Sequence, residues 1–153
     1  MSNVEQRLAA AGIELPTPVA PIANYVPFVR SGSSLYISGQ VSLDASGGIT
    51  GTVGTDVDLE TAQKAARLCG INLLAQMKAA CDGDLERVVR VVKLGGFVQA
   101  GPDFHDIPSV INGCSDVMVE AFGDPGRHAR SAVGVYKLPR NFSVEVDAVV
   151  EVR

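Results

Sequence analysis

The sequence predicts a single α+β domain in which two helices pack on one face of a single β-sheet. Three observations support this prediction. Segments with strand and helix character follow one another in the order ββ(β)αβαββ, each long helical segment has one apolar face, and the final strand alternates apolar and charged residues. A length of 153 residues suits one domain, with residues 1–21 as an N-terminal helix and proline-rich lead-in and residues 22–153 as the main body.

The N-terminal part of the chain is predicted to form a short helix, an extended segment and a hairpin. The helix covers Asn3–Ala11, and the prolines of "LPTPVAPIANYVP" keep the next segment extended, so we interpret it as a surface lead-in rather than a recognition ligand. Strands at Tyr25–Val29 and Leu35–Ile37 flank the turn "RSGSS". Gly39 marks a bulge or a close approach to the backbone, and a short strand is expected near residues 49–53.

Two long helices with a strand between them are predicted for the middle of the chain. Asp58 can cap the first helix, whose apolar or small residues recur in steps of three and four. The segment "LERVVRVVKLGGFVQA" is rich in valine and predicts a strand, with a bulge at Gly95-Gly96. A second helix is expected near Pro108–Phe122. The positions expected on the first helix's buried face are Ala62, Ala65, Ala66, Cys69, Leu73, Met77 and Ala80.

The last two strands are predicted over residues 131–138 and 143–152, with a turn at 138–141. If they pair as an antiparallel hairpin, Glu145 lies opposite a residue near Gly134. One face of the last strand is apolar, whereas the other carries Glu145, Asp147, Val149 and Glu151. A sheet face of this mixed kind is typical of a subunit interface, so we expect an oligomer.

Composition excludes several classes of protein. Hydrophobic residues make up 46% of the chain and charged residues 20%, which is typical of a globular protein, and the formal net charge of −4 makes nucleic-acid binding an unfavoured function. Three cysteines without a CxxC pair indicate free buried thiols in a reducing cytoplasm. His105 and His128 are too few for a metal site, and neither a signal peptide nor a membrane-spanning run is expected.

Arg130 and Glu145 are the candidate chemical groups. A guanidinium can hold a carboxylate by two parallel hydrogen bonds, and a nearby carboxylate can position and polarise a water molecule. The two side chains could lie along one pocket wall. The alternative is structural, because an arginine at a strand edge often prevents edge pairing and a glutamate on a mixed face is often exposed or paired. "GGITGTVG" lacks the strand and helix that a phosphate-binding loop requires.

The segments "LYISGQVSLDASGGITG" and "ARSAVGVYKLPRNFSVEVDAV" resemble the two signature regions of the Rid (YjgF/UK114) family of imine deaminases. The second pattern is satisfied without a gap from Ala129 to Ala148, and the resemblance covers about residues 22–153. It implies a chorismate-mutase-like fold, a homotrimer with sites between subunits, and no metal or cofactor. The N-terminal segment is longer than in the compact members of the family, which indicates a divergent branch.

The resemblance also implies roles for individual residues. Arg130 would hold the carboxylate of the substrate, and Glu145 would activate water. Tyr25 and Gly39 would border the substrate. Ala132, where many relatives have cysteine, would also contact it, and Asn112 is a candidate for the pocket asparagine of the family. The implied reaction is hydrolysis of a 2-imino acid, or its enamine, to a 2-keto acid and ammonia.

Two other functions remain open at this stage. The chain could be a non-catalytic module that binds a small carboxylate such as a 2-keto acid, which Ala132 favours. Endoribonuclease or translation-inhibitor activity (L-PSP-like) is often attached to this family, but the acidic charge and scarce aromatic residues support it poorly.

Overall fold

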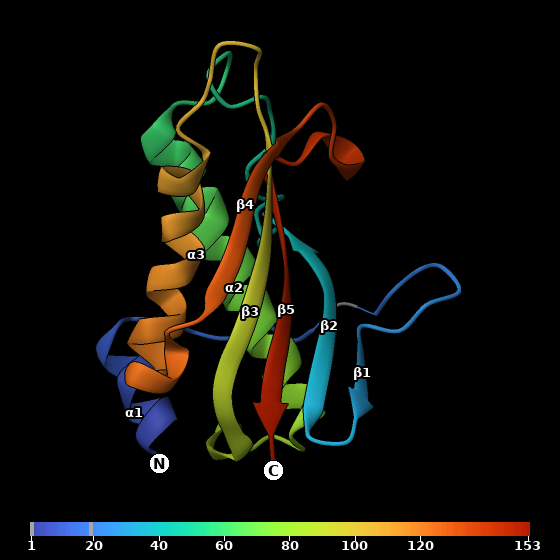
Figure 1. The fold of residues 1–153 in the computed structure, drawn as a ribbon, viewed down its shortest axis with the longest axis vertical. Helices are drawn as coiled ribbons and strands as arrows, with labels where there is room; N and C mark the ends of the chain where they lie inside the picture. Colours follow the sequence, from blue (N-terminus) through green and yellow to red (C-terminus); the bar gives the residue numbers. More distant parts are fainter. Residues whose placement is uncertain (1, 19) are drawn as a thin grey trace.

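Five strands form one mixed sheet with the order β1-β2-β5-β3-β4, and the helices lie together against one of its faces (Figure 1). The computed structural model describes residues 2–18 and 20–153. The strands are β1 (Phe28–Ser31), β2 (Ser34–Val41), β3 (Val88–Gln99), β4 (Ala129–Val135) and β5 (Val144–Val152). The helices are α1 (Asn3–Ala10), α2 (Leu59–Ala80) and α3 (Ile107–Phe122), with single 3₁₀ turns at Leu85–Arg87, Asp124–Gly126 and Pro139–Asn141. The predicted fold class is therefore confirmed.

Helix α2 begins and packs as its sequence predicts. The Asp58 side chain accepts a hydrogen bond from the Thr61 N–H at 2.8 Å, which caps the N-terminus. All the predicted face positions are buried except Ala80, which is partly buried. Gly70 permits close contact with α3, because a Cβ atom there would lie 3.1 Å from Cβ of Val117 and 3.3 Å from Sγ of Cys114. The two helices therefore form one layer over the sheet.

The N-terminal helix α1 joins the same helical layer, packing beside α3. Val4 and Leu8 are buried in the common core, and Ile13 continues this contact beyond the helix. The Ser2 side chain accepts a hydrogen bond from the Glu5 N–H, so the helix has a regular N-terminal cap. The segment after it runs back across the molecule toward β1 (Figure 1). Among the described residues, no helix combines the length and apolar composition that crossing a bilayer requires.

The predicted pairing of the last two strands is wrong. Strand β4 pairs in parallel with β3, whereas β5 lies between β2 and β3 and runs antiparallel to both. The reason lies in burial: alternate residues of β5 are almost completely buried from Val144 to Val152, so this strand needs neighbours on both sides and a helix above it. No residue of β4 is fully buried, and it takes the edge. Glu145 consequently pairs with Val41 and Phe97, not with a residue near Gly134.

Two smaller predictions are also wrong. Residues 49–53 form only isolated bridges, such as Thr50 with Phe142, and not a strand. Gly95 and Gly96 pair regularly with both neighbouring strands, and the bulges of β3 fall earlier, before Lys93. The glycines are needed for space, because a Cβ atom at Gly96 would lie 2.7 Å from Cδ1 of Ile111 on α3.

Candidate active site

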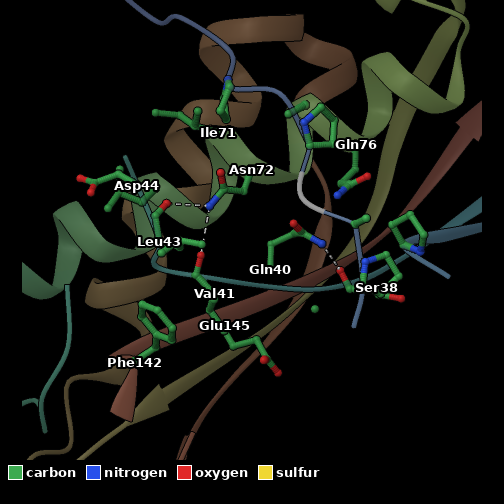
Figure 2. Close-up of a pocket in the computed structure, with 18 of the residues that line it drawn as sticks. Ser38, Gln40, Val41, Leu43, Asp44, Ile71, Asn72, Gln76, Phe142 and Glu145 are labelled. Carbon is green, nitrogen blue, oxygen red and sulfur yellow. Dashed lines mark hydrogen bonds between the residues drawn. The ribbon is translucent and has the colours of Figure 1, made fainter. Parts of the chain in front are cut away.

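A cavity of about 800 Å³ lies where the open edge of β2 meets the lead-in and α2 (Figure 2). Three of the residues predicted for the site line it: Tyr25, Gly39 and Glu145. Strand β1 pairs with β2 as far as Ile37, and the Ser38 N–H still donates to the carbonyl oxygen of Pro27 at 2.9 Å. Beyond Ser38, β2 has no strand partner on this side among the described residues, and its residues face the cavity. The proline-rich segment forms another wall, which means that it is part of the cavity and not only a surface lead-in.

Glu145 lies on the sheet face opposite the helices. Its neighbours Val144 and Val146 are buried, and Val146 pairs with Gly96, which contacts α3, so alternation directs Glu145 to the other side. Half-burial, followed by the negative charge of Asp147, raises the pKa of its carboxyl above the ordinary value. A carboxylate with a raised pKa is a better proton acceptor near neutral pH than an exposed one.

Gly39 is a point of close approach, as one of its two interpretations required. A Cβ atom at this position would lie 2.9 Å from Cδ and 3.0 Å from Oε2 of Glu145. The other interpretation is also confirmed, because the register of β2 against β5 shifts between Ile37 and Gln40. The bulge therefore brings bare backbone against the carboxylate, and any side chain here would displace Glu145.

Arg130 lies on the helix-covered face of the sheet. It pairs with Leu94, which is fully buried beneath the helices, and its guanidinium reaches α3. Nη1 donates to Oγ of Ser115 at 3.0 Å, and Nη2 donates to the carbonyl oxygen of Pro108 at 3.3 Å. Among the described residues, Nε and one hydrogen on each terminal nitrogen have no protein partner, so the guanidinium is oriented and still has donors for a ligand.

Two further predicted residues lie in the same region as Arg130. Ala132 follows it on the same face of β4 and packs against the core. Asn112 is exposed on α3. It lies four residues after Pro108 and three residues before Ser115, so it shares the helix face that the Arg130 guanidinium contacts. The structure therefore brings Arg130, Ala132 and Asn112 together at the outer edge of the sheet.

A hydrogen-bonded chain that the sequence did not predict holds Arg130. Oγ of Ser115 lies 2.9 Å from Nε2 of His128, whose Nδ1 lies 2.6 Å from the carbonyl oxygen of Gly126. The carbonyl can only accept, so Nδ1 carries the proton, Nε2 accepts from the serine hydroxyl, and Oγ accepts from Arg130. Burial, and then the charge of Arg130, lower the pKa of His128, although its bond to Gly126 acts in the opposite direction. The histidine is therefore neutral near pH 7.

Arg130 and Glu145 do not lie along one wall within this chain. Their strands are separated by β3, which puts them two strand spacings, roughly 10 Å, apart across the sheet. Along β3, Arg130 pairs with Leu94 and Glu145 with Phe97, which adds roughly another 10 Å. The side chains also point to opposite faces, so one small molecule cannot touch both in a single protomer.

Arg140 lines the cavity, although the sequence did not predict it as a site residue. It follows Pro139 in the turn before β5, with a left-handed φ of 55°, and the next residue, Asn141, has a φ of 64°. Both residues lie in the turn that was predicted, but nothing in the pattern indicated that the turn would meet the lead-in and Glu145 around one cavity. Arg140 is the one basic residue among the described residues of the lining.

The remaining reactive groups are accounted for by burial. Cys69, Cys81 and Cys114 are free and buried, as expected, and burial raises the pKa of the Cys114 thiol to about 12. Across residues 2–18 and 20–153, histidine, cysteine and carboxylate side chains form no group of three that could hold a metal ion.

Comparison with known proteins gives concordant results. Residues 5–151 match the family model described as "YjgF/chorismate_mutase-like, putative endoribonuclease". The chain is 47% identical over 151 residues to protein TCP17 of Trypanosoma cruzi (97% of this chain, 94% of the relative). It is 33% identical over 136 residues to a 2-iminobutanoate/2-iminopropanoate deaminase of Dermatophagoides farinae (88% and 91%). The crystal structure of Atu1372 from Agrobacterium tumefaciens is similar, with a TM-score of 0.92 and 50% identity (98% and 92%).

Proposed function

Because the chain belongs to the YjgF/chorismate-mutase-like family, we propose that it hydrolyses reactive 2-imino acids, or their enamine tautomers, to 2-keto acids and ammonia. The proposed site lies between protomers of a homotrimer in the cytoplasm. One protomer supplies Arg130 with Ala132 and Asn112, and its neighbour supplies Glu145 with Gly39 and Tyr25. The observation that carries the proposal is that Arg130 and Glu145 lie too far apart within one chain to contact the same small molecule.

The open face of the sheet supports an interface between protomers. Val29, Tyr36 and Val133 each expose about half of their surface on this side, beside the carboxylates of Glu145 and Asp147. An exposed apolar sheet face with embedded charges is costly in a monomer and is typical of association surfaces. Docking of a second protomer on this face would bring a foreign edge strand near Glu145.

Arg130 would bind the carboxylate of the imino acid with the donors that α3 leaves free. Its other donors are held by Ser115 and Pro108, so the fork is fixed in direction before substrate arrives. Fixing the carboxylate also fixes the imine carbon relative to one water molecule. This orientation removes part of the entropic cost of a free encounter.

Glu145 would act as the general base for this water. As the water oxygen forms a bond to C2, the carboxylate takes its proton and the electrons of the C=N π bond move to nitrogen, which is protonated. In the resulting carbinolamine the hydroxyl proton passes by way of the Glu145 carboxylate to nitrogen, the C–N bond breaks, and ammonia leaves as the C=O bond of the keto acid forms. The raised pKa of Glu145 suits it to both accept and return the proton. The reaction needs no cofactor.

The direct test generates 2-iminopropanoate from alanine with an amino-acid oxidase and follows its disappearance. The wild-type protein is expected to accelerate hydrolysis, and Arg130→Ala is expected to lower kcat/KM by roughly a hundredfold or more. Arg127→Ala, which removes a neighbouring arginine whose ion pair with Asp124 is exposed, is the matched control. If Arg130→Ala is as active as the wild-type protein, the proposed activity is abandoned.

A non-catalytic module that binds 2-keto acids in the same cleft is the second candidate. Ala132, which stands where a cysteine is found in the deaminases that this segment resembles, favours it because a reactive side chain is missing beside Arg130. Saturable binding of pyruvate by calorimetry, without turnover of any imine, would support this candidate. Turnover that depends on both Arg130 and Glu145 would exclude it.

A further inference from the structure

Gln76 on α2 is a buried amide that faces the cavity. The residue is only 3% exposed and lines the cavity that Glu145 also lines. Within residues 2–18 and 20–153, no hydrogen bond joins its side chain to another protein group, and Figure 2 shows the amide pointing into the space between the lead-in and Gln40. Among the described residues, no fully buried side-chain nitrogen or oxygen lacks a hydrogen-bond partner, so the unpaired amide atoms of Gln76 are the part of the residue that reaches the cavity surface. An otherwise buried amide that presents its donor and acceptor to a cavity indicates a position for a ligand group.

Two other amides lie beside Gln76. Asn72 is one helical turn earlier on the same face of α2, and its Nδ2 donates to the carbonyl oxygens of Val41 at 3.1 Å and Leu43 at 3.0 Å. Both of its hydrogens are used, which leaves Oδ1 as an acceptor at the cavity (Figure 2). Nε2 of Gln40 donates to the carbonyl oxygen of Ser38 at 3.0 Å. The far end of the cavity therefore offers neutral hydrogen-bonding groups.

The rest of the cavity is apolar, and its charged residues are mainly acidic. Lead-in and α2 residues form the apolar walls: Leu15, Pro16, Pro21, Ile22, Ile71 and Ala75. Among the described residues of the lining, the charged ones are Glu14, Asp44 and Glu145 against Arg140. A second carboxylate on the ligand would meet this excess of negative charge, whereas a neutral polar group would not.

We propose that this cavity receives the side chain of the imino acid, and that the preferred substrates have a long, largely apolar side chain ending in a neutral hydrogen-bonding group. The inference rests on the proposed function, which puts the imine carbon at Glu145. The side chain then extends past the open edge of β2, between the lead-in and α2, to Gln76. A cavity of about 800 Å³ is ample for an aromatic side chain.

The test compares the imines made by an amino-acid oxidase from tyrosine, phenylalanine and alanine. The first two differ by one hydroxyl, and the third has no side chain to fill the cavity. The wild-type protein is expected to hydrolyse the tyrosine-derived imine with a kcat/KM about tenfold above that of the phenylalanine-derived one. In Gln76→Leu this ratio should fall to about one, with the alanine-derived imine unaffected.

Two further variants control the experiment. Gln63→Leu makes the same chemical change on the same helix, at a residue that donates to the carbonyl oxygen of Ser109 and does not line the cavity, and it should keep the wild-type ratio. Ile71→Phe narrows the cavity without changing its polarity. It should slow both aromatic imines while sparing the alanine-derived one, and it tests the cavity independently if Gln76→Leu does not fold.

The possible results separate the inference from the proposed function. If the alanine-derived imine is hydrolysed but the aromatic ones are not, or if Gln76→Leu keeps the wild-type ratio, the inference is overturned and the proposed function stands. If no imine is hydrolysed, the proposed function fails. Calorimetry with 4-hydroxyphenylpyruvate and phenylpyruvate then decides the inference: a preference for the hydroxylated acid that Gln76→Leu removes supports it, and equal affinities overturn it.

Discussion

Arg130 and Glu145 lie on opposite faces of one sheet, with β3 between their strands. Each has its own supporting structure: α3 and His128 hold the arginine, and the bulge at Gly39 lies against the glutamate. If both act on one substrate, they must come from different protomers. This relationship leads to the first prediction.

Two inactive variants are expected to restore activity when they are mixed. In a ring of protomers, a chain with Arg130→Ala keeps Glu145, and a chain with Glu145→Ala keeps Arg130. Random co-assembly at equal amounts should then make about one quarter of the sites intact. Imine hydrolysis by the co-refolded mixture measures this fraction, with each variant refolded alone as control. Mass spectrometry can show that mixed oligomers have formed. If these mixed oligomers hydrolyse the imine no faster than either variant alone, the site lies within one chain or one of the two residues takes no part in it.

Gly39→Ala is expected to impair turnover more than stability. The new methyl group would start 2.9 Å from Cδ of Glu145, so the carboxylate must move, and a displacement of about 1 Å can cost tenfold to a hundredfold in kcat. The backbone of Gly39 does not have a positive φ, so alanine adds no conformational strain there. Steady-state kinetics and a thermal melt check both parts. An unchanged kcat would show that Glu145 need not be where the structure has it.

Asp147→Asn is expected to shift the pH dependence of kcat/KM to lower pH. Burial is the larger cause of the raised pKa of Glu145 and remains in the variant, whereas the second cause, the Asp147 charge, is removed. The general base is active when ionised, so activity falls as pH drops through its pKa. The acidic limb should therefore move down and stay above the ordinary value of 4.5. Glu151→Gln, farther along the same face, is the control; an unmoved limb would remove Glu145 as the titrating base.

The same shift has a consequence for folding. Because the pKa of Glu145 is raised in the folded state, the folded protein holds this proton more tightly than the unfolded chain. The contribution of Glu145 to the free energy of unfolding is therefore greatest at a pH below its pKa in the unfolded chain. It decreases as the pH rises from that pKa to the higher pKa of the folded protein. In Asp147→Asn this pH range should narrow, which urea titrations at several pH values can measure.

Ser115→Ala is expected to raise KM with little change in kcat. Nη1 of Arg130 would lose its acceptor while Nη2 kept the carbonyl of Pro108, so the guanidinium would stay charged but be less well oriented. We expect a KM increase of about threefold to tenfold, as for the loss of one modest hydrogen bond. Ser109→Ala, on the same helix but bonded to Asp106, is the control. A fall in kcat with constant KM would instead assign Ser115 a part in the chemical step.

Gly96→Ala is expected to destabilise the protein by about 1–3 kcal/mol through overpacking. The added Cβ would lie between 2.7 and 2.9 Å from three atoms of Ile111. Ile111→Val in the same chain should recover part of the loss, because it removes Cδ1, which the new atom would approach most closely. Urea unfolding of the single and double variants measures the effect. Full stability in Gly96→Ala would mean that α3 moves away from β3 without cost.

The sequence by itself determined the elements, the fold class and the chemical residue types. Helical periodicity located α2 and α3, alternation located the buried face of β5, and the gap-free pattern from Ala129 to Ala148 pointed to Arg130 and Glu145. These signals are local, because they depend on the steps between neighbours along one helix or strand. The same reasoning found both properties of Gly39.

Only the tertiary structure decided which strands are neighbours and what the lead-in does. The turn at residues 138–141 suggested a hairpin of β4 and β5. Instead, β5 pairs along both of its edges in the centre of the sheet, and β4 forms an outer strand. That choice separates Arg130 from Glu145, and it gathers Gln76, Arg140 and the lead-in around one cavity. Strand order and cavity walls arise from contacts between residues far apart in the chain, which no local period encodes.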